Sequence, residues 1–391
     1  MLVLVDDAGR ALGVLPSFEA SVPWWMDTTA IADGARAHHG ADVAVLRILT
    51  ADRPKQPGGT VVYAAQAADA ETLPLKPVPD DLRALAETDH PLRADYARPG
   101  GPLATVAWAT DELGRAGRGP VTAARQQRTW NLSSIWRLDT ATGPAWIKEV
   151  PPFFGHEPAV LRWLVDHGHA ALAPSVIATD GRRMLLDHIP GEDLYGTNGS
   201  IRHAIAADMH AIQVTATVDT LLAIGLPDRR DLTARLTEVI QSSSLADDPR
   251  LRGLVDGLAE RLAQVASCGL PDTLVHGDLH PGNVIGTADG RRVILDWGDS
   301  VVGNPALDIV RLTDGLPYDE AASIQREWSG WWREAVPGCD PDRAITLLRP
   351  LIEVYYASIY ADFLRGIEPS EHPYHREDVP DCLGRAAEQA S

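Results

Sequence analysis

The chain has 391 residues, 45% of them hydrophobic and 23% charged, which is enough apolar content for more than one globular core. The formal net charge of −19 argues against nucleic acid or an anionic membrane as the main partner, because both favour clustered Lys and Arg. No apolar run approaches the roughly 18 residues of a membrane span, and no basic segment followed by an apolar core opens the chain, so we expect a cytoplasmic protein. The cysteines, Cys268, Cys339 and Cys382, are spaced for neither a disulfide framework nor a zinc site, and we expect free thiols.

Residues 1–95 predict a small α+β module. Apolar runs at 1–5 and 11–15 flank an Asp-Asp-Ala-Gly turn, which indicates a β-hairpin. A helical segment over 28–39 ends at Gly40, and strands are expected at 43–49 and 60–65. Trp24-Trp25-Met26 either contacts the rest of the protein or lies in the core of the module, and the sequence leaves both alternatives open.

Residues 96–124 read as a linker with a short helix, and the pattern then changes to strands. Alternating residues over 129–138 and 145–150 predict two strands separated by a turn. The apolar run over 183–189 predicts a buried strand that enters a hinge at Pro190-Gly191. Amphipathic helices are expected at 201–214 and 251–265, and the remainder from 317 is helical.

Oxygen-bearing side chains gather in one stretch near residue 280. Two apolar runs, each ending in an aspartate, flank the turn-rich loop His276-Gly-Asp-Leu-His-Pro-Gly-Asn283, and Asp296-Trp-Gly-Asp299 follows the second run. Phosphoryl transfer from a nucleotide needs a base facing the acceptor hydroxyl and hard oxygen ligands that hold Mg²⁺ against the phosphates. Asp278, Asn283 and Asp296 could supply that set. The competing interpretation is that these are ordinary turn and strand-end residues.

His-Gly-Asp-x-His-x-x-Asn followed by Asp-Trp-Gly resembles the catalytic and metal-binding loops of the aminoglycoside phosphotransferase and choline kinase family, relatives of the protein kinases. The resemblance spans about residues 125–391. It implies that Asp278 is the catalytic base and that Asn283 and Asp296 bind Mg²⁺. It also implies supporting roles for three further residues, which are His276, His280 and Asp308.

The same resemblance implies a nucleotide site, for ATP or GTP. Lys148 fits the lysine that holds the α- and β-phosphates, and Glu157 could pair with it from the following helix. The loop that contains Ser133 and Ser134 stands where protein kinases have a Gly-rich loop. The end of the strand at Asp187, His188 and Ile189 would border the pocket for the base.

The acceptor side is expected in the C-terminal helices. Asp299 lies three residues beyond the predicted metal ligand, and aromatic residues such as Trp332 and Tyr355 could form walls of the pocket, although a helical aromatic stripe is usually core. The negative net charge would suit a cationic acceptor. An acidic surface that serves only solubility is the alternative.

We therefore expect an α+β, bilobal protein-kinase-like fold with an additional N-terminal domain. The predicted domains are an α+β cap (1–95), a linker (96–124), a β-rich N-lobe (125–190) and a mainly helical C-lobe (191–391) with nucleotide held between the lobes. The cap weakly resembles a Nudix hydrolase, but its helix lacks the metal-binding glutamates, so we expect it to be inactive.

The expected function is transfer of the γ-phosphate of a nucleoside triphosphate to a hydroxyl of an antibiotic, aminosugar, nucleoside or related metabolite. With an antibiotic as acceptor, the expected role is antibiotic resistance. Two alternatives stay open, namely a kinase of a peptide or protein Ser/Thr and a catalytically silent nucleotide-binding module. Silent relatives usually lack the base or a metal ligand, and this chain has the whole set.

Overall fold

The computed structural model describes residues 1–390, and the chain divides into two compact units. Unit 1 comprises Met1–Gly155, Val176–His188 and Asp362–Glu377, and unit 2 comprises His156–Ser175, Ile189–Ala361 and the chain from Asp378. One boundary falls between His188 and Ile189, just before the predicted hinge at Pro190-Gly191. Unit 1 thus contains the predicted cap, the linker and most of the predicted N-lobe. Within residues 1–390, no helix is long and apolar enough to cross a membrane.

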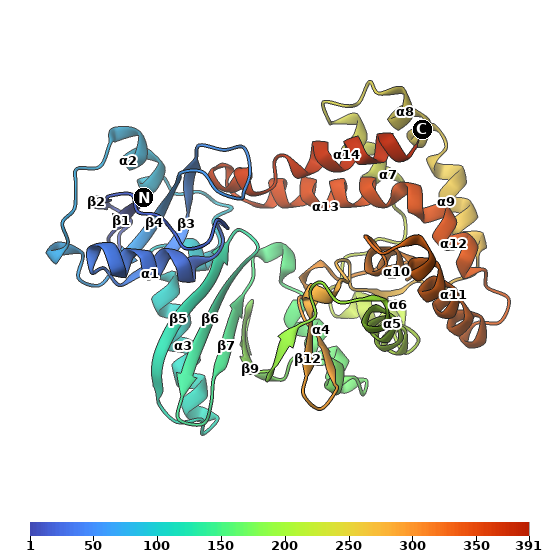
Figure 1. Ribbon diagram of the computed structural model, residues 1–391, viewed down its shortest axis with the longest axis horizontal. Helices are drawn as coiled ribbons and strands as arrows, with labels where there is room; N and C mark the ends of the chain where they lie inside the picture. Colours follow the sequence, from blue (N-terminus) through green and yellow to red (C-terminus); the bar gives the residue numbers. More distant parts are fainter. Residues whose placement is uncertain (391) are drawn as a thin grey trace. The chain divides into compact units, whose positions relative to one another are not determined.

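The first part of unit 1 is a four-stranded mixed sheet in the order β2-β1-β4-β3 (Figure 1). Its elements are β1 (Leu2–Val5), β2 (Ala11–Leu15), α1 (Thr28–His39), β3 (Val43–Ala51), β4 (Val61–Ala67) and α2 (Asp80–Glu87). The predicted hairpin forms, with Leu2 opposite Leu15, and β1 also pairs in parallel with β4. Alternate residues of β1 enter two different apolar clusters, so both faces of this sheet are covered.

The two ends of α1 follow from its sequence. The Asp27 side chain accepts a hydrogen bond from the amide of Ala30, which caps the N-terminus. Gly40 ends the helix with φ of 66°, a left-handed conformation that glycine adopts without a steric penalty. The predicted boundaries of this helix match the structure.

A second, five-stranded antiparallel sheet forms the rest of unit 1 in the order β5-β6-β7-β9-β8. Its strands are β5 (Val121–Trp130), β6 (Ser133–Thr140), β7 (Ala145–Glu149), β8 (Val176–Asp180) and β9 (Arg183–Asp187). Helix α3 (Gly101–Arg115), predicted as part of the linker, packs Ala109 and Leu113 against Ile147 of this sheet. The linker is therefore a structural element of unit 1.

Gln126 joins the two sheets of unit 1. Its side-chain oxygen accepts a hydrogen bond from the amide of Val45 at 2.8 Å, and its side-chain nitrogen donates to the carbonyl of the same residue at 2.7 Å. Because Gln126 is only 5% exposed, this pair of bonds satisfies polar groups that would otherwise be costly to bury.

The C-terminal part of the chain returns to unit 1 as a short segment, Asp362–Glu377, that we call the strap. Tyr374 of the strap is buried and packs edge-on against Trp25 and Trp130, with ring centroids 5.9 and 5.7 Å away. Trp25 thus lies in the core of the N-terminal module, whereas Trp24 remains 51% exposed. Both alternatives for this stretch hold for Trp25, which lies in the core of the module and also contacts Tyr374 outside it.

A buried ion network holds the strap. Arg93 donates to both carboxylate oxygens of Glu368, at 2.9 and 2.7 Å, and the Nε atom of Arg47 lies 3.4 Å from the same carboxylate. All three side chains are at most 6% exposed. Arg47 also donates to the carbonyls of Leu85 and Ala86. Buried charges are tolerated because each has an opposite charge and hydrogen bonds.

Unit 2 is mainly helical. Its helices are α4 (Glu157–Asp166), α5 (Gly199–Gln213), α6 (Val218–Ala223), α7 (Thr233–Gln241), α8 (Pro249–Asp256), α9 (Leu258–Ser267), α10 (Ala306–Leu312), α11 (Tyr318–Ala335), α12 (Pro341–Leu348), the first part of α13 (Ile352–Gly366) and α14 (Asp378–Gln389). Two small sheets accompany them, one of β10 (Gly191–Asp193), β12 (Val284–Thr287) and β13 (Arg292–Ile294) and one of β11 (Thr273–Val275) and β14 (Val301–Gly303). The predicted helix over 251–265 is wrong in one respect, because Gly257 divides it into α8 and α9.

Replacing Glu368 by Ala should lower the stability of unit 1, because Arg47 and Arg93 would then be buried without a counter-charge. We expect a loss of about 3–5 kcal/mol in the free energy of unfolding, measured by chemical denaturation. The control is Asp33→Ala, which removes an exposed pair with Arg36 and should cost less than about 1 kcal/mol. Equal effects of the two substitutions would contradict this role of the network.

Glu371 should make stability depend on pH. Burial, with the charge of Glu368 adding to it, raises the pKa of Glu371 from 4.5 to about 8. The folded protein therefore keeps a proton that the unfolded chain releases, so stability should fall as the pH rises from about 4.5 to about 8. The free energy of unfolding, measured by chemical denaturation across this pH range, should depend less on pH in Glu371→Gln than in the wild type. Glu71→Gln, whose side chain is exposed, should keep the wild-type dependence on pH.

Candidate active site

The loop between β11 and β12 holds the predicted catalytic residues, and Gly277 gives it its shape. Gly277 has φ of 88°, and a Cβ atom there would lie 2.3 Å from the carbonyl oxygen of Asp299. Both the backbone angle and the close approach exclude a side chain. The chain can thus turn sharply directly before Asp278, with the Asp296–Asp299 segment packed against the turn.

Asp308 on α10 holds the backbone of this loop. Its carboxylate accepts hydrogen bonds from the amides of His276 (2.9 Å) and Gly277 (3.1 Å), and also from the side chain of Gln213 (3.0 Å). Burial raises the pKa of Asp308 to about 7, although the two backbone hydrogen bonds oppose the increase. This is the supporting geometry that the family resemblance implied for Asp308.

His276 connects the catalytic loop to the strand that leads to Asp296. Its ring is fully buried, and Nε2 donates to the carbonyl of Leu295 at 2.8 Å while Nδ1 accepts from the amide of Asp278 at 3.3 Å. Each ring nitrogen therefore has a fixed role, and burial lowers the pKa of the ring, which keeps it neutral. The amide of Leu295 also donates to the carbonyl of Asn283 at 2.8 Å, so the two loops form one hydrogen-bonded body.

The carboxylate of Asp278 combines access with a fixed orientation. Oδ1 accepts a hydrogen bond from Nε of Arg311 at 2.9 Å, and Oδ2 lies 3.4 Å from Nε2 of His280. Burial alone would raise the pKa of Asp278, but His280 and Arg311 outweigh it and hold the pKa well below its usual range. The side chain is 36% exposed, so an ionised carboxylate is available to an incoming hydroxyl.

The tautomer of His280 follows from its contacts. Nδ1 accepts from the amide of Gly282 at 3.1 Å, so it carries no proton and Nε2 bears the hydrogen that faces Asp278. His280 thus supports Asp278 as a hydrogen-bond donor.

Asn283 and Asp296 are both arranged to present oxygen atoms. The Nδ2 atom of Asn283 donates to the carbonyl (3.0 Å) and to Oδ2 (3.3 Å) of Asp278, which directs Oδ1 elsewhere. Asp296 has φ of 61° and ψ of 59°, and it is the only non-glycine residue with positive φ in the described chain, 1–390. Such a conformation costs about 1–3 kcal/mol and is typical of functional positions.

These two oxygen donors fit a hard divalent cation such as Mg²⁺. A carboxylate and an amide oxygen are suitable ligands, and Mg²⁺ usually takes few protein ligands and completes its shell with phosphate oxygens and water. In the described part of the chain, no group of three His, Cys, Asp or Glu side chains is placed to hold a metal ion without such help.

Glu157 lies at the start of α4, where it is only 2% exposed. Its Oε1 atom accepts a hydrogen bond from the amide of Trp297 at 3.2 Å, next to Asp296. Glu157 thereby connects α4 to the predicted metal loop within unit 2. Its predicted pairing with Lys148, a residue of unit 1, stays a prediction.

Lys148 lies near the end of β7 and is half-buried. Ala145, Ile147 and Glu149 alternate with it and are buried, and Glu149 accepts a hydrogen bond from Thr105 of α3 at 2.5 Å. Because successive side chains of a strand point to opposite faces, Lys148 lies on the face opposite α3. The half-exposed position is compatible with its predicted contact with phosphates.

The hydroxyl groups of Ser133 and Ser134 already have partners in unit 1. Ser133 accepts from the indole nitrogen of Trp130 and Ser134 from that of Trp136, each at 3.2 Å, and both serines are buried. The β5–β6 turn that they follow is therefore fixed by its own side chains. The predicted contact of these hydroxyl groups with phosphates stays a prediction.

The predicted hinge residues are held at the end of β9. Asp187 forms an ion pair with Arg118, and Nδ1 of His188 accepts from the indole nitrogen of Trp146 at 3.2 Å. Their side chains are thus occupied, which leaves backbone groups, including those of Ile189, for the predicted base pocket.

Two of the predicted acceptor residues lie in the interior. Trp332 is 1% exposed and packs against Trp328, and Tyr355 is 2% exposed. Asp299 is half-buried, and its negative charge adds to the effect of burial, which raises the pKa of Tyr355.

Sequence reasoning missed Arg311, which contacts Asp278. Its position three residues after Asp308 on one helix face is the signal that could have identified it.

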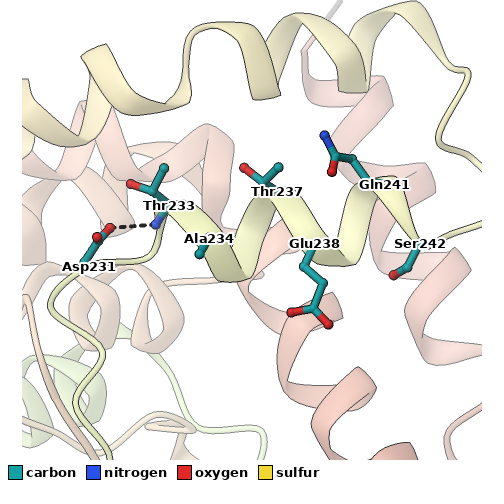
Figure 2. A pocket seen from close by; sticks show the side chains of 7 residues that line it. All are labelled: Asp231, Thr233, Ala234, Thr237, Glu238, Gln241 and Ser242. Atoms are coloured by element: carbon teal, nitrogen blue, oxygen red, sulfur yellow. Dashed lines mark hydrogen bonds between the residues drawn. The ribbon is translucent and has the colours of Figure 1, made fainter.

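A separate open pocket runs along α7 and contains none of the predicted site residues (Figure 2). Most of the residues that line it are polar, and the Asp231 side chain accepts from the amide of Thr233 at 2.8 Å. The lining residues are Asp231, Thr233, Ala234, Thr237, Glu238, Gln241 and Ser242. We assign this pocket no role in the chemistry.

Comparison with known proteins identifies a family for the segment that contains these loops. Residues 150–341 match the phosphotransferase enzyme family. The matched segment is just under half of the chain and contains both predicted loops. The match covers the whole loop region from Glu157 to Asp308, and it identifies the chain as a phosphotransferase. No curated protein matches the sequence.

Solved structures share the fold of this phosphotransferase. Choline kinase LicA from Streptococcus pneumoniae has a TM-score of 0.53 and 14% identity, and the alignment covers 73% of this chain and 99% of that one. Macrolide 2'-phosphotransferase MphH from Brachybacterium faecium has a TM-score of 0.50 and 16% identity, covering 70% and 97%. At these identities the similarity establishes the protein-kinase-like α+β fold. The Nudix resemblance of residues 1–95 receives no support from these matches and stays a prediction.

Replacing Asp308 by Asn should loosen the catalytic loop, because the two backbone N–H groups are bound by different carboxylate oxygens and one of these becomes an NH2 group, which cannot accept. We expect the amides of His276 and Gly277 to exchange hydrogen faster, as measured by hydrogen–deuterium exchange, and turnover to fall. The control is Asp319→Asn, since Asp319 lies in the first turn of the next helix, α11, and its side chain is exposed. Unchanged exchange in Asp308→Asn would contradict the bracing role.

Proposed function

We propose that this phosphotransferase transfers the γ-phosphoryl group of a nucleoside triphosphate, ATP or GTP, to a hydroxyl group of a small molecule. The observation that carries the proposal is the exposed, ionised carboxylate of Asp278 in the same hydrogen-bonded body as Asn283 and the strained Asp296. Phosphoryl transfer depends mainly on positioning and electrostatic stabilisation, and this rigid arrangement provides both.

Each residue has a proposed role. Asp278 accepts a hydrogen bond from the acceptor hydroxyl and takes its proton as the new O–P bond forms. Asn283 and Asp296 hold Mg²⁺, which when bound would neutralise charge on the phosphates. Lys148 binds the α- and β-phosphates, and Glu157 supports it. His276, His280 and Asp308 keep the loop in shape.

The proposed acceptor class is supported by the two structures named above, which are a choline kinase and a macrolide 2'-phosphotransferase. We therefore propose an antibiotic, an aminosugar, a nucleoside or a related metabolite as acceptor. Asp299 is the proposed acceptor contact from the loop that carries the metal ligands.

The proposal is tested by a screen of nucleoside diphosphate release with a panel of such acceptors, run with ATP and with GTP. Asp278→Ala serves as the blank. General base catalysis typically contributes about 10²- to 10⁴-fold in rate, so this variant should lose most of its turnover but keep nucleotide binding. Turnover of Asp278→Ala equal to that of the wild type would exclude Asp278 as the base.

The metal assignment has its own test. Nucleotide should raise the melting temperature of the wild type more when Mg²⁺ is present, and Asp296→Asn should lose this Mg²⁺-dependent increment because its carboxylate is gone. The control is Asp289→Asn, since Asp289 is an exposed carboxylate in the turn between β12 and β13. If Asp296→Asn keeps the full increment, Asp296 is not the principal ligand.

A further inference from the structure

Helix α10 contacts the catalytic loop through Asp308 and through Arg311. The family resemblance implied a supporting role for Asp308 but none for Arg311. Asp308 holds the backbone of His276 and Gly277, as described above. Three residues later, Arg311 donates from Nε to Oδ1 of Asp278 at 2.9 Å. Residues at this spacing lie on the same face of a helix. One helix face therefore fixes both the loop backbone and the side chain that is to accept the proton.

The guanidinium group of Arg311 is itself held in place. Its central carbon lies 5.5 Å from the centroid of the Tyr356 ring on α13, and Nη1 lies 3.8 Å from the carboxylate of Asp314. Burial alone would lower the pKa of Arg311, but the charge of Asp278 outweighs it and raises the pKa, so the group is always charged. A planar cation on an aromatic ring has little rotational freedom.

We propose that Arg311 is a positioning residue for the transfer reaction, acting through Asp278. This inference rests on the proposed function. Arg311 occupies Oδ1 and fixes the plane of the carboxylate, so that Oδ2 remains the oxygen that receives the acceptor hydroxyl. The bonds from His280 and Asn283 to Oδ2 are longer, 3.4 and 3.3 Å, and leave room for a further hydrogen bond.

In the transfer step, Oδ2 of Asp278 receives the proton of the acceptor hydroxyl. The acceptor O–H bond breaks and its proton passes to Oδ2 of Asp278, while the acceptor oxygen forms a bond to the γ-phosphorus. The bond from the γ-phosphorus to the bridging oxygen breaks, and the nucleoside diphosphate leaves with that electron pair. Arg311 neither gives nor takes a proton. Its contribution is to keep the carboxylate aligned until the transfer.

The test uses the full-length protein, ATP as donor and water as acceptor, so that no knowledge of the natural acceptor is needed. In Arg311→Ala we expect kcat for Asp278-dependent ATP hydrolysis to fall about tenfold to a hundredfold, because a misplaced base loses alignment. KM for ATP should stay unchanged. Arg311→Lys should recover part of the rate, since it restores the charge without the planar fork.

Chemical rescue distinguishes positioning from a merely structural role. Arg311 has a side-chain exposure of 29%, so millimolar guanidinium chloride can reach the space left in Arg311→Ala and should raise its kcat severalfold. The matched control is Arg333→Ala, which removes an exposed pair with Asp342 elsewhere in unit 2 and should leave kcat unchanged with or without guanidinium. If Arg311→Ala is poorly folded, Arg311→Met keeps the volume and is assayed in its place.

The outcomes separate the two claims. A wild type with neither Asp278-dependent hydrolysis nor Asp278-dependent transfer to any acceptor of the panel overturns the proposed function, and this inference with it. Where only transfer is detected, the Arg311 variants are compared on that transfer. An active wild type together with an Arg311 variant of unchanged kcat overturns only the inference. A lower kcat that neither lysine nor guanidinium restores, or a change confined to KM, shows a structural or binding role and also overturns the inference.

Discussion

The candidate site depends on one buried carboxylate, that of Asp308. It accepts two successive backbone amides, those of His276 and Gly277, in a place where neither amide could find water. An unpaired buried amide costs about 1–3 kcal/mol, so the loop has a strong preference for this one conformation. Gly277 makes the conformation possible because a Cβ atom would collide with Asp299. Asp278, Asn283 and Asp296 then occupy fixed positions with respect to one another.

The N-terminal module is tied to the rest of unit 1 by contacts remote in sequence. Tyr374 fills its core and Glu368 neutralises Arg93, although 275 residues separate this last pair. These strap residues lie beyond the segment 150–341 that matches the family. The strap and the module therefore share one core within unit 1, to which Tyr374 contributes.

The sequence predicts local features well, because local physics determines them. The N-terminal hairpin, the capped helix α1 and the turn-rich catalytic loop each follow from residues close together in the chain. The support of the loop by Asp308 was also implied, through the family resemblance. Gly257, in contrast, interrupts a regular amphipathic pattern, and periodicity alone did not reveal that the helix ends there.

What the sequence could not predict depends on long-range packing. Arg47 lies in a strand that reads as apolar, and nothing near it in the chain indicates the buried partner Glu368. Trp332 and Tyr355 fit an acceptor pocket as well as a core until the helices are assembled around them. Arg311 could be placed on the same helix face as Asp308, but its contact with Asp278 requires the folded loop.

The central claim is that the carboxylate of Asp278 directs a phosphoryl group from a nucleotide to a hydroxyl compound. The most direct measurement follows radioactive phosphate from γ-labelled ATP into a mixture of hydroxyl-bearing antibiotics, aminosugars, nucleosides and choline. Our account predicts a labelled organic product with the wild type and at most a trace with Asp278→Asn at equal nucleotide occupancy. A labelled product formed equally by both proteins would contradict it.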